Sequence, residues 1–337
     1  MRHRVLGTTG ITVSEFALGA MTFGSFANAD HDESIRMIHT ALDAGVNFID
    51  TADVYSQGES EEIVGKAIKG RRDDVVVATK FYFPMGDDPN RGGGSARWIK
   101  RAVEDSLRRL DTDYIDLYQM HRPDERTDID DSLGALTDLV RAGKVRTIGS
   151  SSFPASEIVE AQWVAEKRGH QRFRTEQPQY SLLVRGIEAD VLPTVQRHGM
   201  GVLTWSPLSA GWLSGRADPS AGSAGRAVWA GMFDMSDPAN EAKLAAVGRF
   251  AELAADAGLS LPTLATAFVL AHPAVTSVII GASKPHHLTG LLAHADTVLG
   301  EDVLDRIDEI VPPGTSVRQN DTFATTPSVQ NKRLRRL

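Results

Sequence analysis

The chain has 337 residues, a formal net charge of −8 and no cysteine. The negative charge argues against a general nucleic-acid or acidic-membrane surface, because both of those partners require clustered positive charge. Without cysteine there is no disulfide, no thiolate metal site and no cysteine nucleophile. The length exceeds the common domain size, but α/β barrels routinely form one unit at this length, so we expect a single domain.

The N-terminal region carries the first structural signals. MRHRVLGTTGITV is positively charged but has no sustained apolar run, and no later stretch is long and apolar enough to span a bilayer, so we expect a cytoplasmic protein. The segment RVLGTTGITV, with its polar, Gly-containing turn, predicts a β-hairpin that closes the floor of a barrel. Asp30 and Glu33 then resemble a capping box at the start of the helix DESIRMIHTALDAG, which Gly45 would end.

Further along, strand-like and helix-like runs alternate. This order is typical of a parallel sheet wrapped by crossover helices, and it predicts an α/β fold, a (β/α)8 TIM barrel. The strand-like runs are VNFI, VVVAT, YIDLYQM, VRTIG, GVLTW and TSVII. Among the helical patterns, SARWIKRAVEDSLRRL has an apolar stripe expected to face the barrel, made of Ile99, Ala102, Val103, Leu107 and Leu110.

Two segments break the alternation. Residues 213–240, after the seventh expected strand, are rich in Gly, Ala, Ser and Pro and are too long for an ordinary connection, which predicts a functional loop. Residues 312–337 have little apolar periodicity and are expected to be a partly ordered tail that frays or lies across the rim. We therefore expect one barrel domain over residues 1–311.

Four polar residues fall at or just after the ends of strand-like runs: Asp50, Tyr55, Lys80 and His121. In a (β/α)8 barrel these ends meet at one rim, where the active site is built. A nearby ammonium at Lys80 lowers the pKa of a phenol such as Tyr55, while Asp50 keeps the lysine charged. A neutral His121 can hydrogen-bond a substrate oxygen, so the four predict a site with Tyr55 as a tunable proton donor.

The chain resembles the aldo-keto reductases, including the potassium-channel β subunits of that family. The resemblance covers nearly the whole chain in order, through the segments VLGTTGITVSEFALGAMTFG, FIDTADVYSQGESEEIVGKAI, ATKF, DYIDLYQMHRPD, VRTIGSSSF, EQPQYSLLVR, TWSPLSAGWLSG and IIGASKP. It implies NADPH-dependent reduction of a small-molecule carbonyl substrate, with hydride from nicotinamide and the proton from Tyr55. It also implies that residues 213–240 cover the cofactor, and it allows a homo-oligomer.

The cofactor site implied by this resemblance lies on the barrel rim. No G-x-G-x-x-G follows a strand, which argues against a Rossmann domain. In the resemblance, Ser151 and Gln177 bind the nicotinamide carboxamide and Trp205 stacks on the ring. The pyrophosphate and adenosine contacts follow along the rim. The full set is Ala20, Met21, Asp50, Ser151, Ser152, Gln177, Trp205, Ser206, Pro207, Leu208, Ser209, Gly211, Leu213, Arg216, Arg226, Gly281, Ser283, Lys284 and His287.

Several alternatives stay open from sequence. His287, Gly290 and Leu291 depart from the family pattern at the adenosine end, which leaves the choice between NADPH and NADH open. The same residues would serve alcohol oxidation, and a nucleotide-sensing accessory subunit is the runner-up. A metal-dependent hydrolase is disfavoured because no strand-end cluster has metal-ligand spacing. Aldehydes, ketones, sugars and polyketide intermediates all remain as substrates, because the specificity loops at 22–30, 81–95, 122–131 and after Trp212 cannot be shaped from sequence.

For single residues, packing competes with function. A lone Tyr55 or His121 is more often a packing or satisfied residue, and Lys80 with Asp50 would by itself read as a surface salt bridge. Arg216 and Arg226 can equally lie on a solvated loop without contacting a phosphate. Aromatic residues that either pack the core or line a substrate pocket are Phe81, Phe83, Trp212, Trp229 and Phe233.

Overall fold

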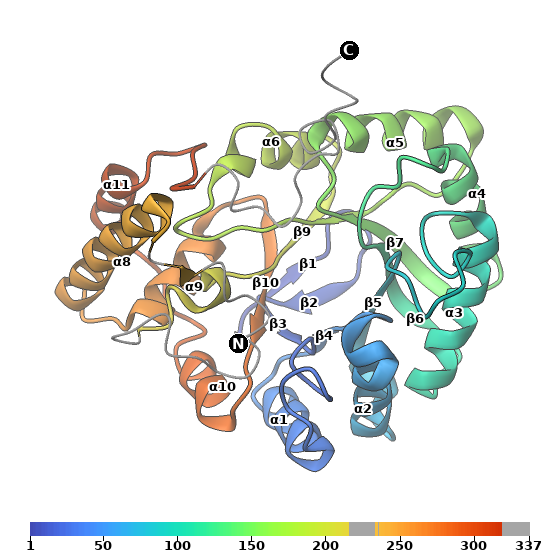
Figure 1. The fold of residues 1–337 in the computed structure, drawn as a ribbon, viewed down its shortest axis with the longest axis horizontal. Helices are drawn as coiled ribbons and strands as arrows, with labels where there is room; N and C mark the ends of the chain where they lie inside the picture. Colours follow the sequence, from blue (N-terminus) through green and yellow to red (C-terminus); the bar gives the residue numbers. More distant parts are fainter. Residues whose placement is uncertain (216–232, 235, 319–337) are drawn as a thin grey trace.

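The computed structural model describes residues 1–215, 233–234 and 236–318. Within them, eight parallel strands close into a barrel in the order β10-β3-β4-β5-β6-β7-β8-β9, with helices around the outside (Figure 1). The predicted (β/α)8 barrel is confirmed. The barrel strands are β3 (Phe16–Gly19), β4 (Phe48–Asp50), β5 (Val76–Phe81), β6 (Ile115–Met120), β7 (Val145–Ser151), β8 (Thr175–Gln177), β9 (Gly201–Thr204) and β10 (Val275–Gly281).

Each strand-like run of the sequence contributes to one of these strands, but two barrel strands were not among those runs. β3 reads FALG and β8 reads TEQ. All residues of both strands are buried. They are too short to show a run of β-branched residues, and TEQ has no apolar residue, so only strand pairing within the closed barrel identifies them.

The N-terminal hairpin closes the bottom of the barrel, as predicted. β1 (His3–Val5) pairs antiparallel with β2 (Thr12–Ser14). Leu6 and Val13 are fully buried in the cluster that fills the lower barrel. Gly7 has a φ of +55°, and a Cβ there would lie 2.5 Å from the backbone nitrogen of Gly201, where β9 begins. Only glycine allows this approach of the turn to the strand.

Helices form the outer layer. α3 begins after Ser95, whose hydroxyl accepts from the backbone N–H of Trp98 at 3.3 Å, and the predicted apolar stripe on this helix is buried throughout. The helices are α1 (His31–Asp43), α2 (Glu59–Ile68), α3 (Ala96–Leu110), α4 (Ile129–Arg141), α5 (Ala155–Arg168), α6 (Val191–Arg197), α8 (Pro238–Asp256), α9 (Leu261–Ala271), α10 (Pro285–Leu292) and α11 (Glu301–Ile310).

The capping box predicted for α1 forms only in its first half. The Asp30 side chain accepts from the backbone N–H of Glu33 at 2.8 Å. The Asp30 N–H donates to Asn28 rather than to Glu33, whose carboxylate instead accepts from the Asn28 amide at 3.0 Å. Gly45, with a φ of +90°, follows the end of the helix as expected.

Most of the two segments expected to be irregular, residues 213–240 and 312–337, lies outside the described residues. The connection from β9 to α8 follows the seventh barrel strand, although its predicted last residues already belong to α8. Before the chain leaves the described part, Thr315 accepts from the Arg185 N–H at 2.9 Å and Val317 donates to Leu183 at 3.0 Å. This stretch therefore lies against the loop that follows β8. The end of the domain at residue 311 stays a prediction.

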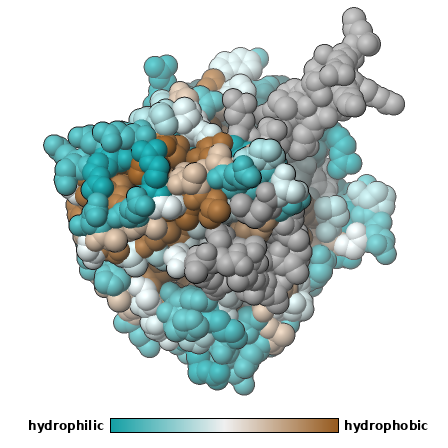
Figure 2. Space-filling view, turned by 60° about the vertical axis from the view of Figure 1, so that its left-hand side comes forward, coloured by the Kyte–Doolittle hydropathy of each residue, from teal (hydrophilic) through white to brown (hydrophobic). Residues whose placement is uncertain are grey.

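The surface view in Figure 2 turns the side with α8 and α11 toward the viewer and shows apolar residues among hydrophilic ones. Leu244 of α8 is an exposed apolar side chain, at 43% of its full exposure. Among the described residues, no single helix is long and apolar enough to cross a membrane, and α8 and α9 reach that composition only together, across a bend of 92°.

Candidate active site

The inner wall of the barrel has an apolar layer with a polar layer above it. Phe48 and Ala78 belong to the buried cluster that includes the hairpin side chains. Successive side chains on a strand point to opposite faces, so the next inward residues on these strands are Asp50 and Lys80. The same step on β6 leads to Gln119. The polar layer therefore lies at the C-terminal ends of the strands, where loops build the active site of such barrels.

Lys80 is the centre of this layer. Its side chain is 0% exposed, so the pair with Asp50 is not a surface salt bridge. The ammonium donates to Asp50 Oδ2 at 2.6 Å, to the Thr51 carbonyl at 2.8 Å and to the Tyr55 hydroxyl at 3.4 Å. Burial lowers the pKa of Lys80, but Asp50 and Tyr55 raise it by more, and it ends above its usual value. Lys80 is therefore an ammonium at neutral pH.

Tyr55 opens the 3₁₀ turn η1 (Tyr55–Gly58), shortly after β4. Burial raises the pKa of its phenol, and the Lys80 ammonium lowers it by less, so the net pKa is above its usual value. The expectation that Lys80 makes this phenol acidic is wrong in its net direction. Loss of water around the phenolate outweighs one nearby ammonium, and the Tyr55 hydroxyl keeps its proton at neutral pH.

His121 follows β6 and faces Tyr55. The two rings meet edge to face with centroids 5.9 Å apart. The Phe83 ring also packs against the His121 ring, with centroids 4.8 Å apart. Burial, followed by the Lys80 and Arg122 cations, holds the pKa of His121 well below its usual range. The imidazole is therefore neutral, and its buried Nδ1 has no hydrogen-bond partner in the described part of the chain.

The second oxygen of Asp50 is held by two amides. Gln177 Nε2 donates to Asp50 Oδ1 at 2.8 Å and Gln119 Nε2 donates to the same oxygen at 3.3 Å. The Gln177 amide also donates to Gln119 Oε1 at 3.2 Å. With Lys80 on its other oxygen, Asp50 is fixed in position by three donors, and Gln177 is tied to the same network.

The residues assigned to the nicotinamide carboxamide are brought together at the ends of β7 and β8. Ser151 Oγ donates to the Gln177 carbonyl at 2.9 Å, which leaves its lone pairs for an incoming N–H. Ser152 has a φ of +58°, and its buried hydroxyl has no partner within residues 1–215, 233–234 and 236–318. An unsatisfied buried hydroxyl beside Ser151 suits a ligand with an amide group.

The turn after β9 has unusual backbone geometry. Ser206, Ser209 and Ala210 all have positive φ, at +58°, +47° and +55°, and such strain in non-glycine residues clusters at ligand clamps. Trp205 packs on the lower barrel cluster from above. Of the other assigned residues here, Leu213 has a fully buried side chain, which leaves none of its surface exposed to a cofactor. Pro207, Leu208 and Gly211 continue the turn.

The assigned adenosine end lies at the C-terminal end of β10, the strand that pairs with β9 on one side and with β3 on the other. The Thr22 hydroxyl donates to the Ala282 carbonyl at 2.9 Å, which brings the segment after β3 next to the end of β10. Lys284 precedes α10 and pairs with Glu33 at 3.5 Å while staying 57% exposed. The residues assigned to the adenosine end here are Gly281, Ser283, Lys284 and His287, and Ala20 and Met21, assigned to the cofactor without a named part of it, follow the neighbouring β3. Arg216 and Arg226, like Trp229, lie outside the described residues.

The aromatic residues considered for the substrate pocket divide into two groups. Phe81 is fully buried against Tyr118, with ring centroids 4.9 Å apart, and Trp212 stacks on Phe233 at 5.2 Å. These three pack the core. Phe83 lies on His121 and belongs to the site.

The sequence interpretation did not single out Gln119, Glu176 or Arg122. Gln119 could have been found because it lies on the inward face of β6, two residues before His121. Glu176 lies one position before Gln177 and is fully buried. Arg122 follows His121, and no sequence pattern marks it. Its guanidinium lies 5.9 Å from the Trp205 ring centroid.

Glu176 is a buried carboxyl beside the site. Burial raises its pKa to about 7, against hydrogen bonds from Ser150 and from the Phe153 N–H at 3.1 Å. An acid with a raised pKa stabilises the fold below its unfolded pKa near 4.5, and that contribution is lost as the pH rises through about 7. We expect Glu176→Gln to remove this loss and to raise the free energy of unfolding by up to about 3 kcal/mol at pH 8.

Urea unfolding of both proteins at pH 5, 6, 7 and 8 measures this effect. Other titrations cancel in the difference between wild type and Glu176→Gln, which should grow with pH and level off above pH 7. A difference that is the same at every pH would show that Glu176 does not titrate in this range.

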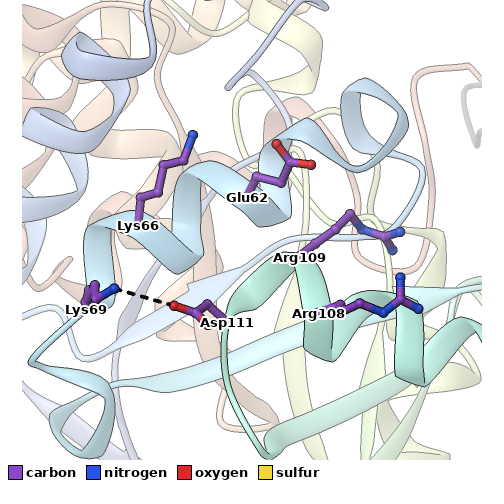
Figure 3. A pocket seen from close by; sticks show the side chains of 6 residues that line it. All are labelled: Glu62, Lys66, Lys69, Arg108, Arg109 and Asp111. Carbon is purple, nitrogen blue, oxygen red and sulfur yellow. Dashed lines mark ion pairs between the residues drawn. The ribbon is translucent and has the colours of Figure 1, made fainter.

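A separate polar pocket of about 440 Å³ lies between α2 and α3, outside the barrel (Figure 3). Two of the cations that line it are held in ion pairs. Lys69 pairs with Asp111 at 3.8 Å, and Arg109 pairs with the buried Glu61 at 2.6 Å. None of the residues that line the pocket belongs to the Lys80 network, and the pocket is not assigned to the reaction.

The described residues contain no group of three or more His, Cys, Asp or Glu side chains that could hold a metal ion. A model of the "Aldo/keto reductase family" matches residues 15–312. The chain belongs to the aldo/keto reductase family. An aldo/keto reductase barrel explains the polar rim described above, and places this protein among the NAD(P)H-dependent oxidoreductases, which reduce carbonyl compounds.

Similar proteins agree with the aldo/keto reductase assignment. The "Uncharacterized oxidoreductase YrpG" of Bacillus subtilis is 39% identical, over 93% of this chain and 97% of its own. The "Probable voltage-gated potassium channel subunit beta" of Oryza sativa is 34% identical, over 92% and 97%. The "Aldo-keto reductase YhdN" of Bacillus subtilis is 35% identical, over 86% and 88%.

Proposed function

We propose that this protein reduces an aldehyde or ketone to an alcohol with NADPH, and that Tyr55 supplies the proton. The observation that carries the proposal is the buried Lys80 ammonium, 2.6 Å from Asp50 and 3.4 Å from the Tyr55 hydroxyl. Bound NADPH supplies the hydride that adds to the carbonyl carbon. The protein supplies the proton, the orientation of the carbonyl and a dry environment.

In this mechanism the Tyr55 hydroxyl donates to the carbonyl oxygen and becomes a phenolate as the C–O bond becomes single. The Lys80 ammonium stabilises that phenolate, and Asp50 holds the ammonium in place. Neutral His121 donates a second hydrogen bond to the same carbonyl oxygen. Ser151, Gln177 and Trp205 are the residues that would hold the nicotinamide end.

The reductive direction has support from the state of Tyr55. Its pKa is raised, so at neutral pH it holds the proton that a general acid must give. Alcohol oxidation needs the phenolate and is favoured only at higher pH. NADPH is favoured over NADH by Lys284, an exposed cation before α10 that can pair with the additional phosphate.

The runner-up is a nucleotide-sensing accessory subunit with weak catalysis. It has support from the similarity to the potassium-channel subunit named above. The presence of both Tyr55 and His121 in contact favours a working enzyme. A cytoplasmic location, a homo-oligomer, and the absence of nucleic-acid and membrane partners stay predictions of the sequence.

A panel of aldehydes, ketones and keto-sugars tests the proposal. We expect NADPH absorbance to fall with several aldehydes, with a kcat in the usual enzyme range of about 1–10³ s⁻¹ for the best of them. NADH should support the same reactions with a higher KM. Tight NADPH binding with negligible turnover on every carbonyl would reject the enzyme and favour the accessory subunit.

A further inference from the structure

Arg122 is a partly buried cation that lacks a carboxylate partner. Other arginines of low exposure are paired: Arg72 with Asp116 at 2.7 Å and Arg185 with Glu188 at 2.8 Å. Within the described residues Arg122 forms no ion pair. Its one hydrogen bond runs from Nη1 to the carbonyl of the preceding His121, at 2.6 Å.

The carboxylate that interacts electrostatically with Arg122 does not fill this role. Glu176 interacts electrostatically with Arg122, but its two oxygens accept from the Ser150 hydroxyl and the Phe153 N–H. The two groups are not within the 4.0 Å of a salt bridge. A guanidinium has five N–H donors, and most of those on Arg122 have no acceptor in the described chain.

The Arg122 guanidinium lies in the wall of the candidate site. Its central carbon is 5.7 Å from the Phe83 ring centroid and 5.9 Å from the Trp205 ring centroid. Phe83 in turn packs on His121, which faces Tyr55. Two aromatic rings thus flank the planar cation, and it interacts electrostatically with Tyr55, the proposed proton donor.

This position has a cost that a ligand would offset. Burial lowers the pKa of Arg122, with no counter-ion in contact. The guanidinium nitrogens that form no hydrogen bond are not among the fully buried polar atoms, so these donors can be reached from solvent. Guanidinium groups with free donors in an apolar setting bind carboxylate and phosphate oxygens in a two-point geometry.

We propose that Arg122 binds an anionic group on the carbonyl substrate, a carboxylate or a phosphate, and so selects anionic carbonyl compounds over neutral ones. The proposal rests on the proposed function and names its substrate class. The carbonyl is oriented by Tyr55 and His121, and the anionic group lies toward Phe83 and Trp205.

Matched substrate pairs test this selection. One pair is 4-carboxybenzaldehyde and methyl 4-formylbenzoate, and the other is glyceraldehyde 3-phosphate and glyceraldehyde. We expect wild-type kcat/KM to be at least about tenfold higher for the anionic member of one pair, since charge-assisted hydrogen bonds contribute at least that factor. The pair that shows the preference tells carboxylate from phosphate.

Arg122→Met keeps an unbranched side chain between the two rings without the charge. It should lower kcat/KM for the preferred anionic substrate at least tenfold, mainly through KM, and change the neutral substrate less than threefold. Arg126→Met is the matched control, because Arg126 is 77% exposed on the same loop and pairs with Asp124. Arg126→Met should leave kcat/KM unchanged for both the anionic and the neutral substrate.

A binding measurement keeps the test independent of turnover. Benzoate and inorganic phosphate are titrated into wild type and Arg122→Met with NADPH bound, with Trp fluorescence as the readout because Trp205 lies beside Arg122. Binding of one anion should weaken at least tenfold in the variant. The proposal would be overturned if Arg122→Met lowered kcat/KM equally for charged and neutral substrates, or if it bound both anions as tightly as wild type. It would also be overturned if wild type showed no preference for an anionic substrate, or if Arg122→Met bound NADPH more weakly. Absence of turnover on every wild-type substrate would instead reject the proposed function.

Discussion

Replacing Tyr55 by Phe is expected to lower kcat for carbonyl reduction by about 10³-fold, within the range typical of a lost general acid. The hydroxyl accepts from the Lys80 ammonium at 3.4 Å, and the ring that carries it contacts the His121 ring edge to face. Phenylalanine keeps the ring and its packing, so the fold and the NADPH affinity should not change. Steady-state kinetics with the best aldehyde of the panel, together with NADPH fluorescence titration, measure both.

A second tyrosine provides the control. Tyr114 precedes β6 at the opposite end of the barrel, and its hydroxyl donates to Asp73 at 3.2 Å. Tyr114→Phe should retain wild-type kcat within about twofold, because this hydroxyl lies at the end of the barrel away from the active site. If Tyr55→Phe turned over aldehydes at the wild-type rate, the proton would have to come from another group and the assignment would be withdrawn.

Replacing Lys80 by Met is expected to lower both activity and stability. The substitution leaves the Asp50 carboxylate buried without its cation, and breaking such a pair costs about 3–5 kcal/mol. The phenolate formed on Tyr55 also loses its nearest positive charge, so kcat should fall by at least about 10²-fold. Urea unfolding at pH 7 and steady-state kinetics on the remaining folded protein measure the two effects.

The double variant Asp50→Asn with Lys80→Met separates the two losses. It removes the buried unpaired charge while leaving a group that the Gln119 and Gln177 amides can still hydrogen-bond. We expect it to recover at least half of the lost free energy of unfolding and none of the activity. A Lys80→Met protein as stable as wild type would mean that Asp50 is solvated or protonated, contrary to its 3% exposure.

The candidate site was predictable because strand geometry is simple. Lys80 and His121 stand at the ends of apolar runs, and parallel strands in a barrel bring such ends to one rim. The structure places Lys80, Asp50, Tyr55 and His121 in contact or one ring apart, as expected. The same alternation of side chains also marks Gln119, which lies on the inward face of β6.

Other features depended on balances that no local pattern contains. The direction of the Tyr55 pKa follows from how fully the packed barrel removes water, set against one ammonium at 3.4 Å. The capping box at Asp30 is only partial because the Asn28 amide hydrogen-bonds both the Asp30 N–H and the Glu33 carboxylate. Neither outcome can be read from residue types and spacing.

The sequence by itself determined the fold class and the polar rim, since alternating periodicities and strand-end residues act through local geometry that repeats along the chain. The reaction class followed from the resemblance of its segments to the aldo-keto reductases. Only the tertiary structure decided which side chains are deprived of water and which remain without a partner. Those properties arise from groups distant in sequence, such as Arg122 beside Phe83 and Trp205, or Gln177 on Asp50. Desolvation and pairing in a closed barrel depend on all of its strands at once.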